Sequence, residues 1–493
     1  MLRPSVLTSG LIVVLSAFAA AQDVGTKAET DRNRAVFPDD EDAVGQRQSL
    51  LAEIKPFVDR QSRPPNIVLI LADDLGYADI GVHGSKTIPT PHIDGIAEGG
   101  VRFSNAYVTA ASCSPSRAGL LTGRYQQRVG FEFNTAGGAI THRLYRGLDP
   151  SAVTLADVLR KAGYKTGMFG KWHLGTRSHL HPLSRGFDRF FGFLAGAHSF
   201  FPAQSEEPIY STMMRGRTAL NEPDYLTDAI AREAVRFIKQ NCKAAFFAYV
   251  PFNAVHTPIE ATEKYEQRFA GERNPKQRAY NAMTSALDDA VGSILSAVSE
   301  NNLDDNTLVV FLNDNGGPIY TGVQSNGALR LGKLFLFEGG VRVPMLMRWN
   351  GVFQPGTVYD QTVSSLDLFP SICSAAGIRL PEQLSLDGVD LSPYVKGKKT
   401  GEPHHKLFWS NGPNRAMRMG NWKLVQSHDH VWLFDLGADL GEKKNLSQSH
   451  PEVVKKMLRE LDLWQVQMPA PAWPSKPRRR KVRTAGGVYE LNI

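Results

Sequence analysis

The chain has 493 residues, 42% of them hydrophobic, with 44 glycines and 29 prolines. This composition excludes a disordered or collagen-like protein, and the length allows one large domain with a smaller one beside it. The formal charge of +7 lies mostly in the Pro-rich tail at 471–493, which contains six basic residues and one acidic residue, Glu490. We therefore expect no nucleic-acid partner. A solvated tail is the favoured interpretation of this basic cluster, with weak binding to anionic polymers as the alternative.

The N-terminal sequence predicts export. Arg3 precedes an apolar stretch from Leu11 to Ala20, and three alanines ending at Ala21 form a small-residue cleavage site before Gln22. A membrane anchor is the alternative, but the apolar run is too short to span a bilayer. Residues 1–21 are thus predicted to be a cleaved signal peptide, which places the protein in the periplasm or outside the cell without an integral membrane segment.

Residues 22–63 are charged and polar and predict a linker with one helix near 50–58. A catalytic domain is expected at 64–400. Continuous apolar runs at 66–72, 245–250 and 307–312 indicate strands buried on both faces, and helical periodicity occurs at 154–162, 228–240 and 280–298. Strands that alternate with helices predict an α/β domain around a mostly parallel sheet flanked by helices. Short strand-like pieces at 406–410, 422–426 and 431–435 predict a small antiparallel α+β subdomain over 401–470.

The chain has only three cysteines, Cys113, Cys242 and Cys373, so no disulfide framework holds this exported protein. Their spacing does not suggest a metal site. If Cys113 is chemically special, the other two form either one bridge or two buried thiols. Their apolar surroundings favour buried thiols.

Oxygen donors follow two of the predicted strands. Asp73 and Asp74 come after the first strand, and Asp314 and Asn315 after the third. Ligands bind at the carboxyl ends of strands in open α/β sheets, and adjacent buried carboxylates repel each other unless a cation joins them. Ligand sets made of oxygen favour calcium or magnesium over zinc. The alternative is that the two aspartates only cap the next helix or turn.

A second group of residues is cationic or protic: Lys171 and His173 in a Gly-bounded segment, His256, and Lys333. Lys171 and His173 are two residues apart, so in extended chain both project to the same side. A cation, several positive side chains and proton carriers suit a doubly charged oxyanion such as sulfate or phosphate. A lone histidine near an apolar run is more often only a structural hydrogen-bonding group.

Cys113-Ser-Pro-Ser-Arg117, continued by Ala-Gly-Leu-Leu-Thr-Gly-Arg124, resembles the signature of type I sulfatases, in the alkaline phosphatase superfamily. Further motifs accompany it in family order: Asn66-Ile-Val-Leu-Ile-Leu-Ala-Asp-Asp-Leu-Gly, Gly170-Lys-Trp-His-Leu-Gly, His256-Thr-Pro, Asn313-Asp-Asn-Gly-Gly, and Gly332-Lys with Glu338-Gly-Gly-Val-Arg-Val-Pro. The similarity covers roughly residues 64 to 450. Two positions depart from the family pattern, namely Val255 before His256 and the run Arg330-Leu-Gly-Lys333.

The resemblance implies an alkaline-phosphatase-like fold and a sulfuric ester hydrolase. A maturation enzyme would read Pro115 and Arg117 and convert Cys113 to formylglycine. Its hydrate would attack sulfur, expel the alcohol and then release sulfate by collapsing back to the aldehyde. The resemblance also implies one calcium ion, bound by Asp73, Asp74, Asp314, Asn315 and an oxygen of modified Cys113, which Arg117 would hold. Lys171 and Lys333 would bind the sulfate group. His173 and His256 would transfer protons, and His256 and Lys333 would protonate or stabilise the leaving oxygen.

The substrate is less determined than the reaction. A carbohydrate O-sulfate is the favoured substrate, and an aryl or steroid sulfate is the alternative. His142, Arg143, His198, Asn326 and the aromatic stretch 187–201 are expected near the pocket, with His198 as a substrate-binding residue, although Phe190, Phe191 and Phe193 could equally be core. Two other functions remain open: a phosphate mono- or diesterase of the same superfamily, and a degenerate protein that binds sulfated glycans.

Overall fold

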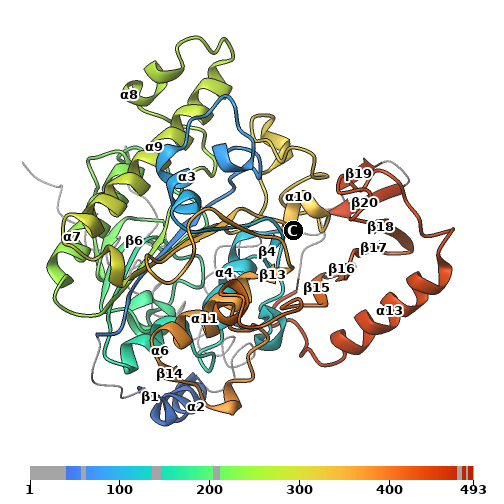
Figure 1. Cartoon of the computed structure of the whole chain (residues 1–493), viewed down its shortest axis with the longest axis horizontal. Coiled ribbons are helices and arrows are strands. Elements are labelled where there is room, and N and C mark those ends of the chain that lie inside the picture. The colour runs from blue at the N-terminus through green and yellow to red at the C-terminus, as the bar shows by residue number, and fades with distance from the viewer. Residues whose placement is uncertain are drawn as a thin grey trace, which may run out of the picture.

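The three predicted strands lie next to one another in the centre of a ten-stranded sheet. Figure 1 shows the whole chain, coloured from blue at the N-terminus to red at the C-terminus, with the C-terminal part on the right. The computed structural model describes residues 40–56, 63–135, 146–203, 211–474, 480–484 and 487–491. The predicted signal peptide and two expected rim residues, His142 and Arg143, lie outside these ranges. β2 (Asn66–Ala72) pairs in parallel with β10 (Thr307–Asn313) on one side and with β9 (Phe246–Pro251) on the other.

The sheet is parallel in its centre and antiparallel toward both edges, as predicted for this fold class. Beyond β9, β5 (Lys165–Lys171) and β6 (Arg189–Phe193) continue in parallel, and β7 (Met214–Arg215) and β8 (Thr218–Ala219) close one edge in antiparallel pairing. Beyond β10 lie β11 (Met345–Arg348) and β3 (Val101–Phe103), both antiparallel to their inner neighbour, and then β12 (Thr357–Tyr359), parallel to β3.

Both faces of this sheet are covered by helices, which explains the continuous apolar runs. Alternate β2 residues such as Leu69 pack with α4 (Cys113–Thr122), α6 (Leu155–Lys161) and α11 (Leu368–Ala375). Those between them, such as Ile70, pack with α3 (Pro91–Glu98), α7 (Leu226–Asn241) and α9 (Pro275–Ser299). Full burial of such a side chain stabilises the fold by about 1.5–3 kcal/mol.

Three helices match their predictions, with longer ends in two cases. α6 begins with a capping box, in which the Thr154 side chain accepts from the Asp157 backbone N–H and the Asp157 carboxylate accepts from that of Thr154. α7 and α9 both begin a few residues earlier than their apolar periodicity indicated. In α9 the added turn carries Pro275 at its first position and the Asn274 side chain as cap.

The prediction of a helix near 50–58 is wrong in its position. α2 (Asp40–Glu53) begins ten residues earlier and ends before β1 (Lys55–Pro56), which pairs with β14 (Ile378–Arg379). Acidic residues in the first turn of a helix interact favourably with its dipole, so the acidic run that suggested a linker is compatible with a helix start. Buried Arg47 donates to the Ser184 carbonyl oxygen at 3.1 Å, which ties α2 to the main domain.

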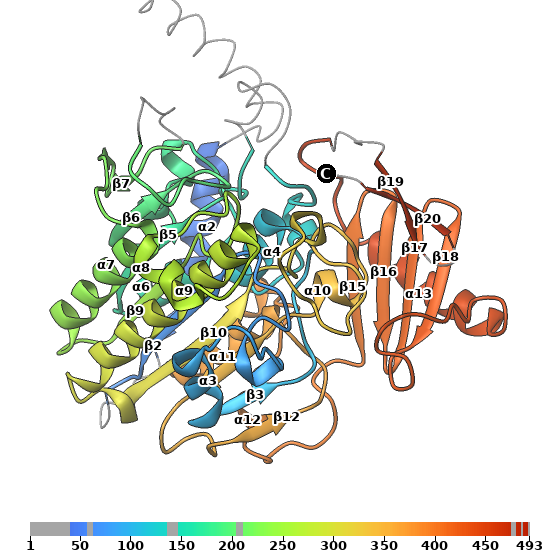
Figure 2. The same cartoon turned by 90° about the horizontal axis from the view of Figure 1, so that it is seen from above.

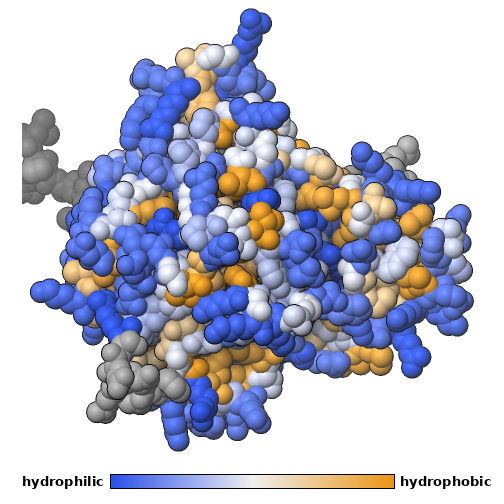
Figure 3. Space-filling view, in the orientation of Figure 1, coloured by the Kyte–Doolittle hydropathy of each residue, from blue (hydrophilic) through white to orange (hydrophobic). Residues whose placement is uncertain are grey.

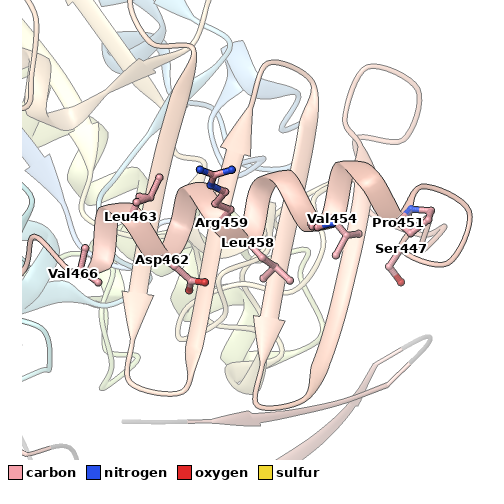
Figure 4. A pocket seen from close by; sticks show the side chains of 9 residues that line it. Ser447, Pro451, Val454, Leu458, Arg459, Asp462, Leu463 and Val466 are labelled. Carbon is pink, nitrogen blue, oxygen red and sulfur yellow. The ribbon is translucent and has the colours of Figure 1, made fainter.

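The C-terminal part forms a second, antiparallel sheet beside the main domain (Figure 2). Its strands follow in chain order: β15 (Lys406–Asn411), β16 (Asn414–Met419), β17 (Trp422–Ser427) and β18 (His430–Asp435). α13 (Pro451–Gln465) buries Met457, Leu461 and Trp464 against one face of this sheet. Its outer side lines a shallow groove and leaves Leu463 51% exposed and, just beyond its end, Val466 79% exposed (Figure 4).

The basic tail is not simply a solvated end. β19 (Arg480–Thr484) and β20 (Gly487–Leu491) form an antiparallel hairpin, and Tyr489 is fully buried against the other face of the C-terminal sheet. A single aromatic residue in a polar tail gives no periodic signal, so the sequence did not indicate this contact.

The remaining short elements are β4 (Ala106–Tyr107) paired with β13 (Val363–Ser364), α8 (Glu263–Glu266), α10 (Glu338–Val341) and α12 (Ser392–Val395). All three cysteines are free thiols; Cys373 is buried as predicted, whereas Cys242 is only half-buried. Among the described residues, none of the helices has the length and apolarity needed to cross a lipid bilayer. On the face seen in Figure 3, hydrophobic residues form scattered spots among hydrophilic ones.

Candidate functional site at the carboxyl ends of the parallel strands

The predicted site residues meet where four parallel strands end. The register pairs Ala72 with Asn313 and Leu71 with Pro251, so β2, β10 and β9 end at one edge of the sheet, with β5 beside β9. Asp73 and Asp74 follow β2, and Asp314 follows β10. Lys171 ends β5, and the segment after β9 is joined to Asp73 through its backbone, since the Val255 N–H donates to the Asp73 carbonyl oxygen at 2.7 Å.

Asp73 forms the first half of the cluster. Its Oδ2 accepts from Lys171 Nζ and lies 3.4 Å from Arg117 Nη2, and the Cys113 thiol lies 3.6 Å from its Oδ1. Arg117 also binds Asp314 Oδ2 through Nε at 2.9 Å and Nη2 at 2.8 Å, and donates to the Lys171 carbonyl oxygen at 2.9 Å. All of these side chains are buried, so their charges interact with little screening.

Asp74 forms the second half. Lys333 Nζ donates to its Oδ2 at 2.7 Å, and Asn315 Nδ2 donates to its Oδ1 at 2.7 Å. His256 Nε2 lies 3.5 Å from the same Oδ2. Asp74 itself has a left-handed backbone with φ +62°. These partners show that the two aspartates form ion pairs and do not merely cap a turn.

The donor atoms suit a divalent cation. Asp73, Asp74, Cys113 and His256 each offer a ligand atom within 4.8 Å of the others. Asn315 adds a buried Oδ1 that has no hydrogen-bond partner among the described residues. Burial and the neighbouring negative charge of Asp73 raise the pKa of Asp314 to about 7 in spite of Arg117. The basic side chains therefore leave negative charge that a hard cation would neutralise.

Both predicted imidazoles lie beside these charges, with His173 buried and His256 partly buried. Burial lowers the pKa of His173, and the positive charges of Lys171 and Arg117 lower it further. Burial and Lys333 likewise lower the pKa of His256. A carbonyl oxygen can only accept, so the 2.6 Å contact of His256 Nδ1 with the Thr257 oxygen places a proton on Nδ1. Nε2, which faces Asp74, is then the nitrogen available for proton transfer. His173 Nδ1 lacks a described partner.

Cys113 begins α4, a helix whose ten residues are all buried. Burial raises the pKa of its thiol to about 12, although Lys171 and Lys333 act in the opposite direction. A protonated thiol is a poor nucleophile. The unmodified side chain is therefore poorly suited to nucleophilic attack at neutral pH.

Most of the expected pocket rim is core or scaffold. Phe187, Phe190, Phe191, Phe193 and Phe200 are buried, and Phe201, at 38% exposure, is the exception. Asn326 is also a scaffold residue, because its amide binds the backbone of Tyr77, Gly317 and Leu331. His198 is buried, with its ring 5.2 Å from that of Phe193. Its role in substrate binding stays a prediction.

Two residues near the cluster were not predicted. Tyr249 lies within β9, where nothing in an apolar run distinguishes it, yet its buried hydroxyl is close enough to feel the charges of Arg117 and Asp314. Tyr320 lies in the turn Ile319–Thr321 and is 53% exposed. Partial burial raises the pKa of its hydroxyl, which also interacts electrostatically with Lys333 and Asp74. The only signal available in the sequence was a tyrosine soon after the Asp-Asn-Gly-Gly segment.

Comparisons with known proteins point to one family. The sulfatase family model matches residues 65–378, and the model of the N-sulphoglucosamine sulphohydrolase C-terminal region matches 330–467. Arylsulfatase A of Bos taurus is 34% identical over 83% of this chain and 89% of its own length. N-acetylgalactosamine-6-sulfatase of Homo sapiens is 34% identical over 80% and 84%. The crystal structure of Ps i-CgsB in complex with k-i-k-neocarrahexaose has a TM-score of 0.78 and 36% identity, covering 83% and 95%.

Proposed function

This chain belongs to the sulfatase family and is a sulfuric ester hydrolase, and on that basis we propose that it hydrolyses a carbohydrate O-sulfate through a calcium-bound formylglycine hydrate made from Cys113. One observation carries the proposal. Three buried cations, Arg117, Lys171 and Lys333, converge with Asp73 and Asp74 around the Cys113 side chain. Such a site suits a small oxyanionic group, such as a sulfate ester, attacked from the Cys113 position.

Asp73, Asp74, Asp314, Asn315 and the modified Cys113 would hold the calcium ion. Bound calcium would supply positive charge that offsets charge developing on the transferred sulfate group. The raised pKa of the Cys113 thiol, about 12 because of burial, supports the need for modification. A hydrated aldehyde would offer one hydroxyl for attack at sulfur and a second whose deprotonation releases sulfate by carbon–oxygen cleavage.

The remaining residues divide into anion binding and proton transfer. Lys171 and Lys333, which approach the cluster from β5 and from the loop before α10, would bind sulfate oxygens. His256 and Lys333 would protonate or stabilise the leaving oxygen of the alcohol, and His173 would accept the proton of the second hydroxyl. Arg117, held by Asp314, would fix the oxygen at position 113.

The substrate class and the cellular location belong to the same proposal. A carbohydrate O-sulfate is supported by the oligosaccharide complex of Ps i-CgsB and by the similarity to N-acetylgalactosamine-6-sulfatase. Export through residues 1–21 would bring the enzyme to sulfated glycans outside the cytoplasm. Since Cys113, Pro115 and Arg117 are buried in the folded chain, a formylglycine-generating enzyme would have to act before α4 is enclosed.

The test is to express the full chain with a formylglycine-generating enzyme and to measure hydrolysis of 4-nitrophenyl sulfate and of a position-by-position panel of sulfated sugars. We expect the Lys171→Ala variant to lose about 100- to 1,000-fold in kcat. Lys406→Ala, which removes a lysine from a surface ion pair with Glu460, serves as the matched control and should retain activity. Phenyl phosphate should be a much poorer substrate.

Mass spectrometry of the peptide that contains Cys113 checks the nucleophile. Active protein should carry an aldehyde in place of the thiol. Full activity in a preparation that contains only unmodified cysteine would refute the mechanism. Hydrolysis of aryl sulfates but of no sulfated sugar would refute the substrate class and leave the mechanism intact.

A further inference from the structure

The segment from Arg330 to Arg342, here called the lysine loop, carries Lys333 but packs its apolar side chains onto the C-terminal sheet. Phe335, Leu336 and Phe337 are buried together with residues of β15, β17 and β18, among them Trp409, Val425, Trp432 and Phe434. The Phe337 ring lies 5.7 Å from that of Trp432 and 6.1 Å from that of Phe434. By its packing, the lysine loop belongs to a different sheet from the one that carries Asp74.

Close backbone contacts within the lysine loop, and between it and the segment after Asn315, connect α10 to Lys333. A Cβ at Gly340 would collide with the carbonyl oxygen of Phe335, and one at Gly316 would collide with that of Gly339. The Gly316 N–H donates to the Gly340 carbonyl oxygen at 3.0 Å, and the Lys333 N–H donates to the Gly317 oxygen at 3.3 Å. A shift of α10 would therefore move Lys333 and also the segment that follows Asn315.

Glu338, the first residue of α10, is held by a lysine from the C-terminal sheet. Lys423 of β17 donates from Nζ to Glu338 Oε1 at 2.9 Å, and both side chains are fully buried. The Lys423 ammonium also lies 4.5 Å from the centre of the Trp409 ring. Tyr107 donates to the other oxygen, Oε2, at 2.7 Å. These contacts leave Glu338 little freedom, because a buried carboxylate keeps its charge only while its partners stay in place.

A second carboxylate fixes the backbone of the same residue. The Glu338 N–H donates to Glu442 Oε2 at 2.8 Å, and the Arg330 guanidinium binds the Glu442 carbonyl oxygen. Burial opposes ionisation of Glu338, but Lys423 and Arg342 outweigh it and lower its pKa to about 2. The Lys423 ion pair is thus formed throughout the physiological range of pH.

We propose that Lys423 is a positioning residue for Lys333, acting through Glu338 and α10, so that the C-terminal sheet sets the place of one sulfate-binding lysine in the active site. This inference rests on the proposed role of Lys333 in binding the sulfate group. In the contacts described above, Lys423 touches neither Lys333 nor any predicted metal ligand, so its effect on the reaction would be indirect.

A double-mutant cycle tests the inference in the full matured chain, with the variants Lys423→Met, Lys333→Ala and the combination of both. Lys423→Met should lower kcat by about 10- to 100-fold and weaken inhibition by inorganic sulfate, which probes the anion site directly. In the Lys333→Ala background the same change should alter kcat less than about threefold, because the lysine to be positioned is already absent. Lys423→Arg should restore most of the activity. Formylglycine content is measured for every variant, so that impaired maturation is not mistaken for misplacement.

Leu461→Ala is the matched control, because it destabilises the C-terminal sheet from the face covered by α13. At an equal loss of Tm it should leave kcat and sulfate inhibition nearly unchanged, and an equal loss of kcat would overturn the inference. Independent, multiplicative effects of Lys423→Met and Lys333→Ala would overturn it as well, while the proposed function would stand. An unchanged kcat in Lys333→Ala would refute the role of Lys333 and the inference with it. If Lys423→Met yields no folded protein, Lys423→Gln, which removes the charge but keeps a donor, replaces it in the cycle.

Discussion

The two lysines proposed to bind sulfate are held in different ways. Lys171 is the last residue of β5, a strand inside the parallel sheet, and it meets Asp73, which follows β2 of the same sheet. Lys333 lies in a loop whose side chains pack onto the second sheet, and it reaches Asp74 from there. The position of Lys171 is therefore set by strand register, and that of Lys333 by the packing of the lysine loop against the C-terminal sheet.

This difference predicts where the site can be disturbed from a distance. Parallel strands that share a register keep their carboxyl ends together as long as the main sheet is folded. The position of Lys333 depends in addition on α10, on Glu338 and on the aromatic cluster around Phe337. We therefore expect changes in the C-terminal sheet to affect Lys333 while the ligands at the strand ends remain intact.

Calcium binding gives the largest expected effect that separates the two halves. A ligand present at a thousand times its Kd stabilises the folded state by about 4 kcal/mol, so chelation should lower Tm and added calcium should restore it. Lys333→Ala should keep this response, because Lys333 is not a ligand. Asn315→Ala should reduce it without changing the net charge, since it removes the Asn315 Oδ1, for which the described part of the chain offers no hydrogen-bond partner. The measurement is Tm by calorimetry with and without calcium, with magnesium as the comparison ion. An equal calcium response in Asn315→Ala would exclude this residue as a ligand.

The same difference separates the site residues that could be predicted from the sequence from the contacts that could not. Asp73, Asp74 and Asp314 could be placed because they follow apolar runs, and strand ends at one sheet edge converge. Lys171 was found from its Gly-bounded segment and its spacing from His173, and not from a predicted strand. The partners of the lysine loop could not be placed, because Lys423 lies in a short strand of alternating polar and apolar residues and Tyr489 in a basic tail. Only the folded chain brings these residues to the lysine loop. The phenylalanines of the stretch 187–201 are mostly core, which was the alternative left open from the sequence, because burial is decided by packing and not by residue type.

Glu442 provides a pH-dependent test of the contact between the sheets. Burial, together with the charge of Glu338, raises its pKa to about 8, although Lys423 opposes the shift. Between its ordinary pKa of 4.5 and about 8, the folded protein keeps a proton that the unfolded chain has released. The free energy of unfolding should therefore fall as pH rises through this window, by at most about 1.4 kcal/mol per pH unit. Glu442→Gln keeps an acceptor for the Glu338 N–H and should remove this fall.

Tm measured from pH 5 to pH 8.5 checks the prediction through the difference between variant and wild type. That difference should grow in favour of Glu442→Gln toward high pH. Glu452→Gln, at an exposed position at the start of α13, should run parallel to wild type. A constant offset between Glu442→Gln and wild type at every pH would mean that Glu442 stays ionised in the fold.

The smallest expected effect concerns the entrance to the site. Tyr320 lies between the ligand segment and the lysine loop in sequence, is 53% exposed, and has a hydroxyl that feels Lys333 and Asp74. An exposed aromatic face beside an anion site suits contact with a sugar ring, and such contacts are worth about 0.5–1.5 kcal/mol. Tyr320→Ala should therefore raise KM for a sulfated sugar by roughly two- to tenfold with little change in kcat, whereas Tyr320→Phe should stay close to wild type. A fall in kcat at constant KM in both variants would instead place the tyrosine hydroxyl in the reaction, on the Lys333 side of the site.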